Sequence, residues 1–125
     1  MNALHMAQTA YGTARKPIRT AKSAEYDAFA HATSRLNKAA RLGRSGFANL
    51  AAALHDNRRL WSALANDVAD ERNELPPSLR ARIFYLAEFT HQHSSKVLRG
   101  EETVDALIEI NTAIMRGLRG SAVTP

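Results

Sequence analysis

The five histidines are the first candidates for chemistry, because neutral imidazole is a common metal ligand. His91 and His93 are two residues apart, which on a helix points their side chains about 200° apart around the axis. They therefore cannot bind one ion together. His5, His31 and His55 have no second histidine at i+4. We predict no metal site and no cofactor.

Carboxylates could act as a general acid and base if they converged on a nucleophile or a polar pocket. Asp67, Asp70, Glu71 and Glu74 do cluster, but at a predicted helix end and loop, where solvated carboxylates are common. The chain has no cysteine, no glycine-rich phosphate loop and no Gly-x-Ser-x-Gly motif. The sequence does not predict an enzyme.

Basic side chains could contact nucleic-acid phosphates, and their distribution is uneven. The formal net charge is +5, and residues 1–60 hold ten Lys or Arg against three acids. The basic groups are Arg15–Lys22, then Arg35, Lys38 and Arg41, then Arg58 and Arg59. The chain breaks at Gly43 and Pro76 fit a helix-turn-helix poorly, so direct contact with nucleic acid is not favoured.

The elements that must position these side chains are helices, because apolar residues recur at helical spacing and no segment alternates with period two. The pattern predicts four main helices over about residues 23–42, 45–71, 77–99 and 103–118, and a weaker short helix within residues 1–14. Predicted N-caps are Ser23 and Thr103; predicted terminators are Gly43, the Pro76–Pro77 pair, Gly100, Gly117 and Gly120. Short connections favour antiparallel neighbours. The expected fold is an all-α bundle of four main antiparallel helices plus a short N-terminal helix, with one domain over 1–120 and a frayed tail over 121–125.

Two predicted helices carry more apolar surface than one core stripe needs. In "LRARIFYLAEF" the stripe of Leu79, Ile83 and Leu86 is accompanied by Phe84, Tyr85 and Phe89 on other sides. The last helix is similarly broad, with Ile110 beside Ile108 and Ile114. Two interpretations stay open: a surface for a partner helix or a second copy, and a wider core.

Two asparagines interrupt the apolar stripes, Asn57 in the second main helix and Asn111 in the last. A buried amide needs hydrogen-bond partners, because an unsatisfied one costs about 1–3 kcal/mol. Asn111 is either a structural pin that sets helix pairing or a group that meets a binding partner.

Three blocks of residues together resemble the FlaF family of alphaproteobacterial flagellar-biosynthesis regulators. The first is an Asn before a Leu-Trp pair, the second is Asn-x-Leu-Pro-x-x-Leu-Arg, and the third is "LIEINTAIMRGL". The candidate residues from these blocks and the adjoining aromatic pair, as family-motif or partner-binding positions, are Asn57, Leu60, Trp61, Leu75, Pro76, Leu79, Arg80, Phe84, Phe89, Leu107, Ile108, Asn111, Ile114, Met115 and Leu118. The N-terminal "AYGTA" also suits that family, and the resemblance extends over nearly the whole chain.

The resemblance implies a small cytoplasmic helical protein that controls flagellin production and is needed for flagellin export. We expect it to bind flagellin as a secretion chaperone, because flagellin's terminal segments become amphipathic helices that an apolar helical surface could hold. Alternatives are regulation through flagellin mRNA and binding to a partner regulator of the FlbT type. No run approaches the roughly 20 apolar residues of a membrane-spanning helix, and no secretory signal is evident, so membrane insertion is not expected.

Overall fold

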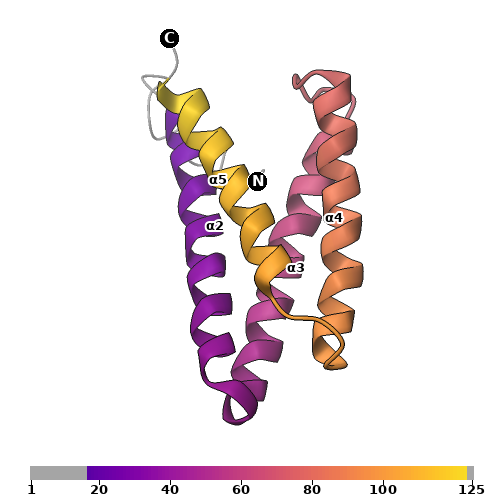
Figure 1. Cartoon of the computed structure of the whole chain (residues 1–125). Coiled ribbons are helices and arrows are strands. Elements are labelled where there is room, and N and C mark those ends of the chain that lie inside the picture. The colour runs from indigo at the N-terminus through magenta and orange to yellow at the C-terminus, as the bar shows by residue number, and fades with distance from the viewer. Residues whose placement is uncertain (1–16, 124–125) are drawn as a thin grey trace.

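A computed structural model describes the backbone of residues 17–123 and the side chains of residues 25–117. Its elements are four α-helices and one short 3-10 helix: α2 (Pro17–Arg41), η1 (Gly43–Gly46), α3 (Phe47–Ala69), α4 (Pro77–Leu98) and α5 (Asp105–Val123). Consecutive long helices run in opposite directions (Figure 1). The predicted all-α bundle of four main antiparallel helices is confirmed. The short helix predicted within residues 1–14 lies outside the described residues.

The first described helix begins earlier than predicted. α2 starts at Pro17, where the fixed φ of proline suits the first turn and its missing N–H is not needed. Ser23 is therefore inside α2 and is not its N-cap, so that prediction is wrong. The capping preference of serine is weak evidence when a proline upstream can open the same helix.

The tight turn between α2 and α3 depends on two glycines. Gly43 has φ of 62°, in the left-handed region that glycine adopts without strain. Gly46 is needed for a different reason: a Cβ there would lie 2.4 Å from Leu42 Cβ and 3.0 Å from the Ala39 carbonyl oxygen. The turn can therefore close only if residue 46 has no side chain.

The predicted glycine cap at the end of α4 is confirmed. Gly100 has φ of 78° and donates its N–H to the Val97 carbonyl, while Glu101 donates to the Lys96 carbonyl. These two bonds make a Schellman cap. Thr103 Oγ1 then accepts a hydrogen bond from the Asp105 N–H, 3.3 Å away, at the start of α5.

The end of α5 differs from the prediction. The helix passes through Gly117 and Gly120 and continues to Val123. A glycine lowers helix propensity by only about 1 kcal/mol and ends a helix where it takes a left-handed conformation. The terminus expected near Leu118 is therefore wrong.

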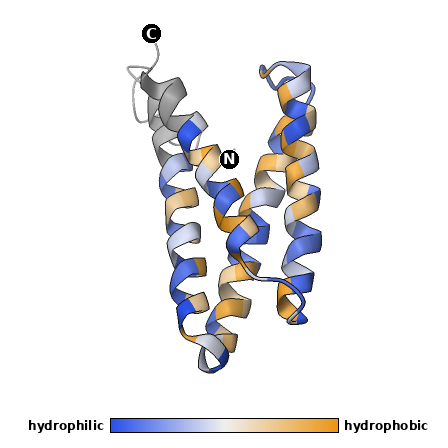
Figure 2. Ribbon diagram, viewed as in Figure 1, coloured by the Kyte–Doolittle hydropathy of each residue, from blue (hydrophilic) through white to orange (hydrophobic). Residues whose placement is uncertain are grey.

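The helices pack in the order α4, α3, α2, α5. α2 makes extensive contacts with both α3 and α5, and α4 packs mainly on α3, whereas α4 and α5 touch only slightly. Their ribbons diverge toward the end of the molecule that holds the C-terminus (Figure 1). Hydrophobic and hydrophilic residues alternate along every helix (Figure 2), as expected for amphipathic helices around a shared core. Within the described residues, no helix has both the length and the hydropathy to cross a bilayer.

The core has two apolar clusters, one toward each end of the bundle. One cluster, which we call the lower cluster because it lies toward the α2–α3 turn at the bottom of Figure 1, is built on Leu36, Ala53, Leu54, Val97, Val104 and Leu107. The upper cluster is built on Phe29, Trp61, Val68, Ile83 and Ala87. Phe29 and Trp61 meet edge to face, with ring centroids 5.5 Å apart. Buried polar side chains, including those of the two asparagines, separate the two clusters.

Candidate partner-binding surface

The two asparagines that interrupt the apolar stripes are bonded to each other in the core. Asn57 of α3 and Asn111 of α5 are both 0% exposed. Asn111 Nδ2 donates to Asn57 Oδ1 over 2.9 Å, and the Trp61 indole Nε1 donates to Asn111 Oδ1 over 2.8 Å. Asn111 therefore has its partners inside the chain and is not available at the surface.

This amide network belongs to a buried polar layer to which every long helix contributes. Its members, placed between the two apolar clusters, are Thr33 of α2, Asn57 of α3, Thr90 and Ser94 of α4, and Asn111 of α5. The hydroxyls of Thr33 and Ser94 donate to the carbonyls of Phe29 and Thr90, each over 2.7 Å. Sliding one helix along another would set these polar groups against apolar side chains, so the layer favours a single register.

The Asn-x-Leu-Pro-x-x-Leu-Arg block caps the C-terminal end of α3. Arg80 donates from Nε to the Val68 carbonyl over 2.8 Å and from Nη2 to the Asp70 carbonyl over 3.0 Å. Asn73 Nδ2 donates to the Asp67 carbonyl over 3.0 Å. The last carbonyls of a helix have no partner within the helix, and these two side chains supply three donors. Arg80 is thus a structural residue in this structure.

The same block presents apolar residues at the surface. Leu75, Pro76 and Leu79 are all exposed around the α3–α4 turn. Their exposure contrasts with Asn73 and Arg80, whose polar groups are bonded to the backbone. The block therefore divides into a structural polar part and an accessible apolar part.

Two of the predicted phosphate-binding cations are engaged within the bundle. Arg35 of α2 pairs with Asp56 of α3. Arg58 crosses to α4, where its Nη2 donates to the His91 carbonyl over 2.7 Å. The observed roles of these arginines are to join neighbouring helices.

The aromatic residues of α4 do not share one face. Phe84 and Tyr85 are 46% and 66% exposed. Phe89 is five residues after Phe84, about 140° further around the helix, and is half-buried against the ring of His93, with centroids 5.2 Å apart. Phe84 and Phe89 of the expected arc therefore lie on two separate surfaces, and Tyr85, four residues before Phe89, lies beside Phe89.

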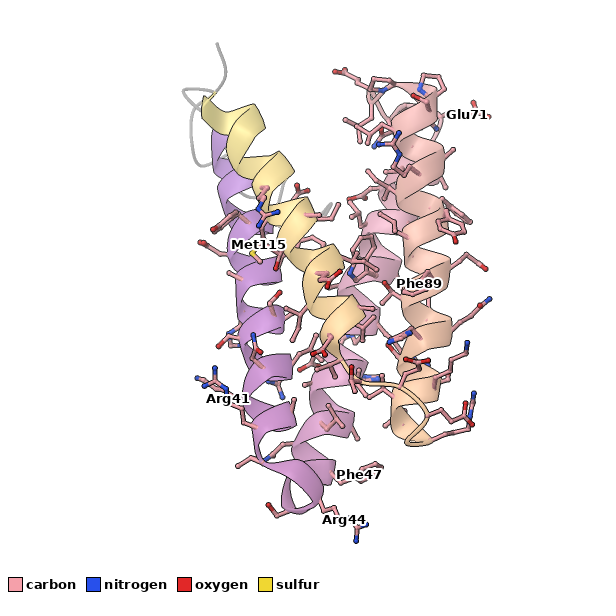
Figure 3. The ribbon with its side chains drawn as sticks, viewed as in Figure 1. Arg41, Arg44, Phe47, Glu71, Phe89 and Met115 are labelled. Carbon is pink, nitrogen blue, oxygen red and sulfur yellow. The ribbon has the colours of Figure 1, made fainter. Side chains whose placement is uncertain are left out.

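One of these surfaces faces α5. His93 Nε2 lies 2.9 Å from the Thr103 carbonyl oxygen, in the segment that leads into α5. Spacings of seven, three and four residues put Leu79, Leu86 and Phe89 on the same side of α4 as His93. Phe89 lies along this part of α4 in Figure 3.

The facing side of α5 is also apolar and half-buried. Ile110 and Ile114 pack with Leu86 around the Trp61 cluster and keep part of their surface exposed. We call Leu79, Leu86, Phe89, Ile110 and Ile114 the α4–α5 surface. Because α4 and α5 make few contacts with each other, these side chains are not fully covered by the opposite helix.

The remaining candidate residues have other positions. Leu107 is fully buried in the lower cluster, where Ile108 packs partly buried. Leu60 and Met115 are partly buried against the upper cluster, and Met115 lies between α5 and α2 (Figure 3). The side chain of Leu118 lies outside the described residues.

Residues outside the list of candidate positions also form the site and its support. Asn73 supplies a cap, Thr90 and Ser94 extend the polar layer, and Leu86 and Ile110 belong to the α4–α5 surface. The last two were recognisable as members of apolar stripes. The capping role of Asn73 had no local signal, because its partner is the end of the preceding helix.

Among the described residues, the titratable groups with clearly shifted pKa values belong to surface ion pairs. Hydrogen bonds from the Arg72 side chain, and then from its backbone N–H, lower the pKa of Asp70 to about 2. The Arg99 side chain likewise lowers the pKa of Glu101. Among residues 25–117, no group of three or more His, Asp or Glu is placed to hold a metal ion.

Comparison with known families gives a match for residues 7–118 to the family described as flagellar protein FlaF. Comparison with curated proteins and with solved structures gives no match. The family match covers nearly the whole chain, including the three blocks that form the amide network, the α3 cap and the apolar side of α5. The chain therefore belongs to the FlaF family of flagellar proteins.

Proposed function

We propose that this protein binds flagellin as an export chaperone and regulator, and that a flagellin helix lies on the α4–α5 surface. The observation that carries the proposal is a row of apolar side chains, exposed at Leu79 and half-buried at Leu86, Phe89, Ile110 and Ile114, between two helices that make few contacts with each other.

The shape of this row suits an amphipathic helix. A helix offers apolar side chains at i, i+3, i+4 and i+7 along one stripe, and such a stripe is bound by an elongated apolar surface. Here α4 and α5 supply the two sides, and the Trp61 cluster lies beneath Ile110 and Ile114. Binding would cover apolar area that is now partly open to water. Each Å² covered would stabilise the complex by about 25 cal/mol, before the entropy lost by ordering the flagellin segment is subtracted.

The rigidity of the site also supports this function. The layer below the surface is fixed by the hydrogen bonds among Asn57, Trp61 and Asn111. A surface held in place by its support loses less conformational entropy on binding than a mobile one. The buried asparagines would thus serve binding indirectly, by holding α5 at its position relative to α3.

Mixing the full chain with purified flagellin monomers tests the proposal. We expect a defined complex on size exclusion and a gain of helical circular dichroism beyond the sum of the two free proteins. Absence of a complex at tens of micromolar, measured by isothermal titration, would contradict it.

Regulation through flagellin mRNA receives less support from the described residues. Arg35 and Arg58 are engaged with Asp56 and with α4, which leaves fewer cations for phosphates. Binding through phosphate contacts would weaken steeply with salt, with a log–log slope of several units. An FlbT-type regulator could use the same α4–α5 surface, and competition between it and flagellin for the protein would reveal a shared site.

A further inference from the structure

The end of the bundle formed by the α2–α3 turn is strongly basic. Over residues 28–55 the chain has Arg35, Lys38, Arg41 and Arg44 and no Asp or Glu. These four residues follow one another at a spacing of three, the first three on α2 and the last on η1. Arg41 and Arg44 project outward from this end in Figure 3. In the part of the chain whose side chains the structure describes, no carboxylate pairs with Lys38, Arg41 or Arg44.

A shallow hollow lies beside these cations, in the crease between α2 and α3. It is lined by Arg35, Lys38, Ala39, Leu42 and Asn49. Ala39 is buried and Leu42 is 50% exposed, so the hollow has an apolar floor. Its rim is cationic on the α2 side and carries the Asn49 amide on the α3 side.

The pair of Arg35 and Asp56 shows the kind of group that this crease accepts. A carboxylate from α3 already lies against the first cation of the series. The next cations along the series, Lys38 and Arg41, are exposed and have no such partner among the described residues. The unused charge and the half-exposed Leu42 lie next to each other.

We propose that this hollow is a second docking site, which binds an acidic segment of a partner protein. One large apolar side chain of that segment covers Leu42 and Ala39, and flanking carboxylates meet Lys38, Arg41 and Arg44. Complementary charge supplies orientation and on-rate, and the buried apolar side chain supplies affinity.

A protein segment fits this site better than nucleic acid or an anionic membrane. A phosphate backbone would satisfy the cations but leave Leu42 uncovered. A flat lipid surface would not enter a recessed crease. The site is formed by α2 and α3, whereas the α4–α5 surface is formed by the other two long helices, so the inference does not depend on flagellin binding.

Fluorescence anisotropy with labelled peptides tests the site on the full chain. The probe has the sequence Glu-Asp-Leu-Glu-Asp; one matched peptide has Ser in place of Leu, and another has Gln and Asn in place of the acids. We expect saturable binding of the probe peptide and no saturable binding of either matched peptide. Leu42→Ser should weaken binding about tenfold or more, the loss expected when a leucine no longer contributes its buried area.

Charge variants distinguish specific contacts in the hollow from a general effect of the protein's net charge on peptide binding. Lys38→Glu should weaken binding several-fold, and less at high salt. Arg82→Glu changes the net charge equally but lies on α4, away from the hollow, and should leave the affinity unchanged. Asn49→Asp complements Leu42→Ser, because it brings a carboxylate to the rim of the hollow without removing an apolar contact. It should also weaken binding, since the new carboxylate repels those of the peptide.

Three outcomes would overturn the proposal. One is no binding of the probe peptide. The second is binding that is unaffected by Leu42→Ser and Asn49→Asp in variants whose circular dichroism is that of the folded protein. The third is a preference for a uridine oligonucleotide or for phosphatidylglycerol vesicles over the peptide, which would assign the cations to a polyanion.

Discussion

Trp61 and Asn111 join α3 to α5 by one buried hydrogen bond, from the indole Nε1 to the amide Oδ1 over 2.8 Å. The backbones of these two helices do not approach each other closely, since α5 packs on α2 and α3 packs on α2 and α4. The bond therefore spans the bundle diagonally. Asn57 extends it on α3 by accepting from Asn111 Nδ2. Three residues from two of the family blocks thus form one structural unit.

Substituting Asn111→Leu should lower the free energy of unfolding by about 2–4 kcal/mol. The change leaves Trp61 Nε1 and Asn57 Oδ1 buried without partners, and each such group costs about 1–3 kcal/mol, partly offset by the added apolar area. Urea unfolding followed by the fluorescence of Trp61, which is the only tryptophan, measures the loss.

The matched control for this substitution is Ala113→Leu, which adds a leucine to an exposed position of α5 and should change stability by less than about 0.5 kcal/mol. An Asn111→Leu protein that unfolds with unchanged midpoint and unchanged cooperativity, but binds flagellin poorly, would show that Asn111 acts in binding instead.

Substituting Arg80→Ala should destabilise the protein by about 1–3 kcal/mol, because the Val68 and Asp70 carbonyls at the end of α3 lose the hydrogen bonds of a charged donor. Amide hydrogen exchange should quicken most in the last turn of α3. Arg82→Ala removes an exposed arginine two residues further along α4, on another side of the helix, and should have little effect. Equal destabilisation by both variants would contradict the capping role.

The Asp70 carboxyl should titrate near pH 2, below its ordinary value of 3.8, because Arg72 donates to its charged form. A lowered folded-state pKa means that the pair stabilises the fold above about pH 3.8 and that this contribution disappears as the pH falls toward 2. Carboxyl chemical shifts followed by NMR give the value directly. In Arg72→Ala the midpoint should return toward the ordinary one, and a midpoint that stays near 2 would identify another cause.

The helices were predictable because each must bury one stripe, and burial imposes a spacing of three and four residues that the sequence carries locally. Helix ends were less predictable. Ser23 and Gly117 are residue types that often mark a terminus, but a helix passes through both. Neither residue type can stop a helix unless the backbone also leaves the helical conformation, as it does at Gly100.

The candidate site was predictable only in part, because its geometry depends on where α5 lies. The excess of apolar residues on α4 and α5 was visible from spacing alone. Which of them face each other follows from α5 packing on α2 and only slightly on α4, a choice between helices that no local pattern encodes. The same limit applies to Arg80, whose motif was recognised while its partners, the carbonyls of Val68 and Asp70, lie on another helix and in the following turn.

The two apolar sides of α4 should differ in their effect on flagellin binding. Leu79 and Ile114 belong to the α4–α5 surface, whereas Phe84, five residues from both Leu79 and Phe89, lies on another side of α4. Leu79→Ser and Ile114→Ser should each weaken the complex about tenfold or more, since each removes apolar area from the proposed contact. Phe84→Ser should leave the affinity within about twofold.

The exposed side chains of α4 also provide their own control for folding. Leu79, Phe84 and Tyr85 are all exposed, so replacing any of them by serine should alter the free energy of unfolding by less than about 1 kcal/mol. A loss of binding in Leu79→Ser that Phe84→Ser does not show would therefore reflect the contact and not the fold, whereas Ile114, packed partly buried on the upper cluster, requires a circular dichroism spectrum of the folded protein from its own variant. If Phe84→Ser abolished binding while Leu79→Ser did not, flagellin would dock on the outer side of α4, and the space between α4 and α5 would have no part in it.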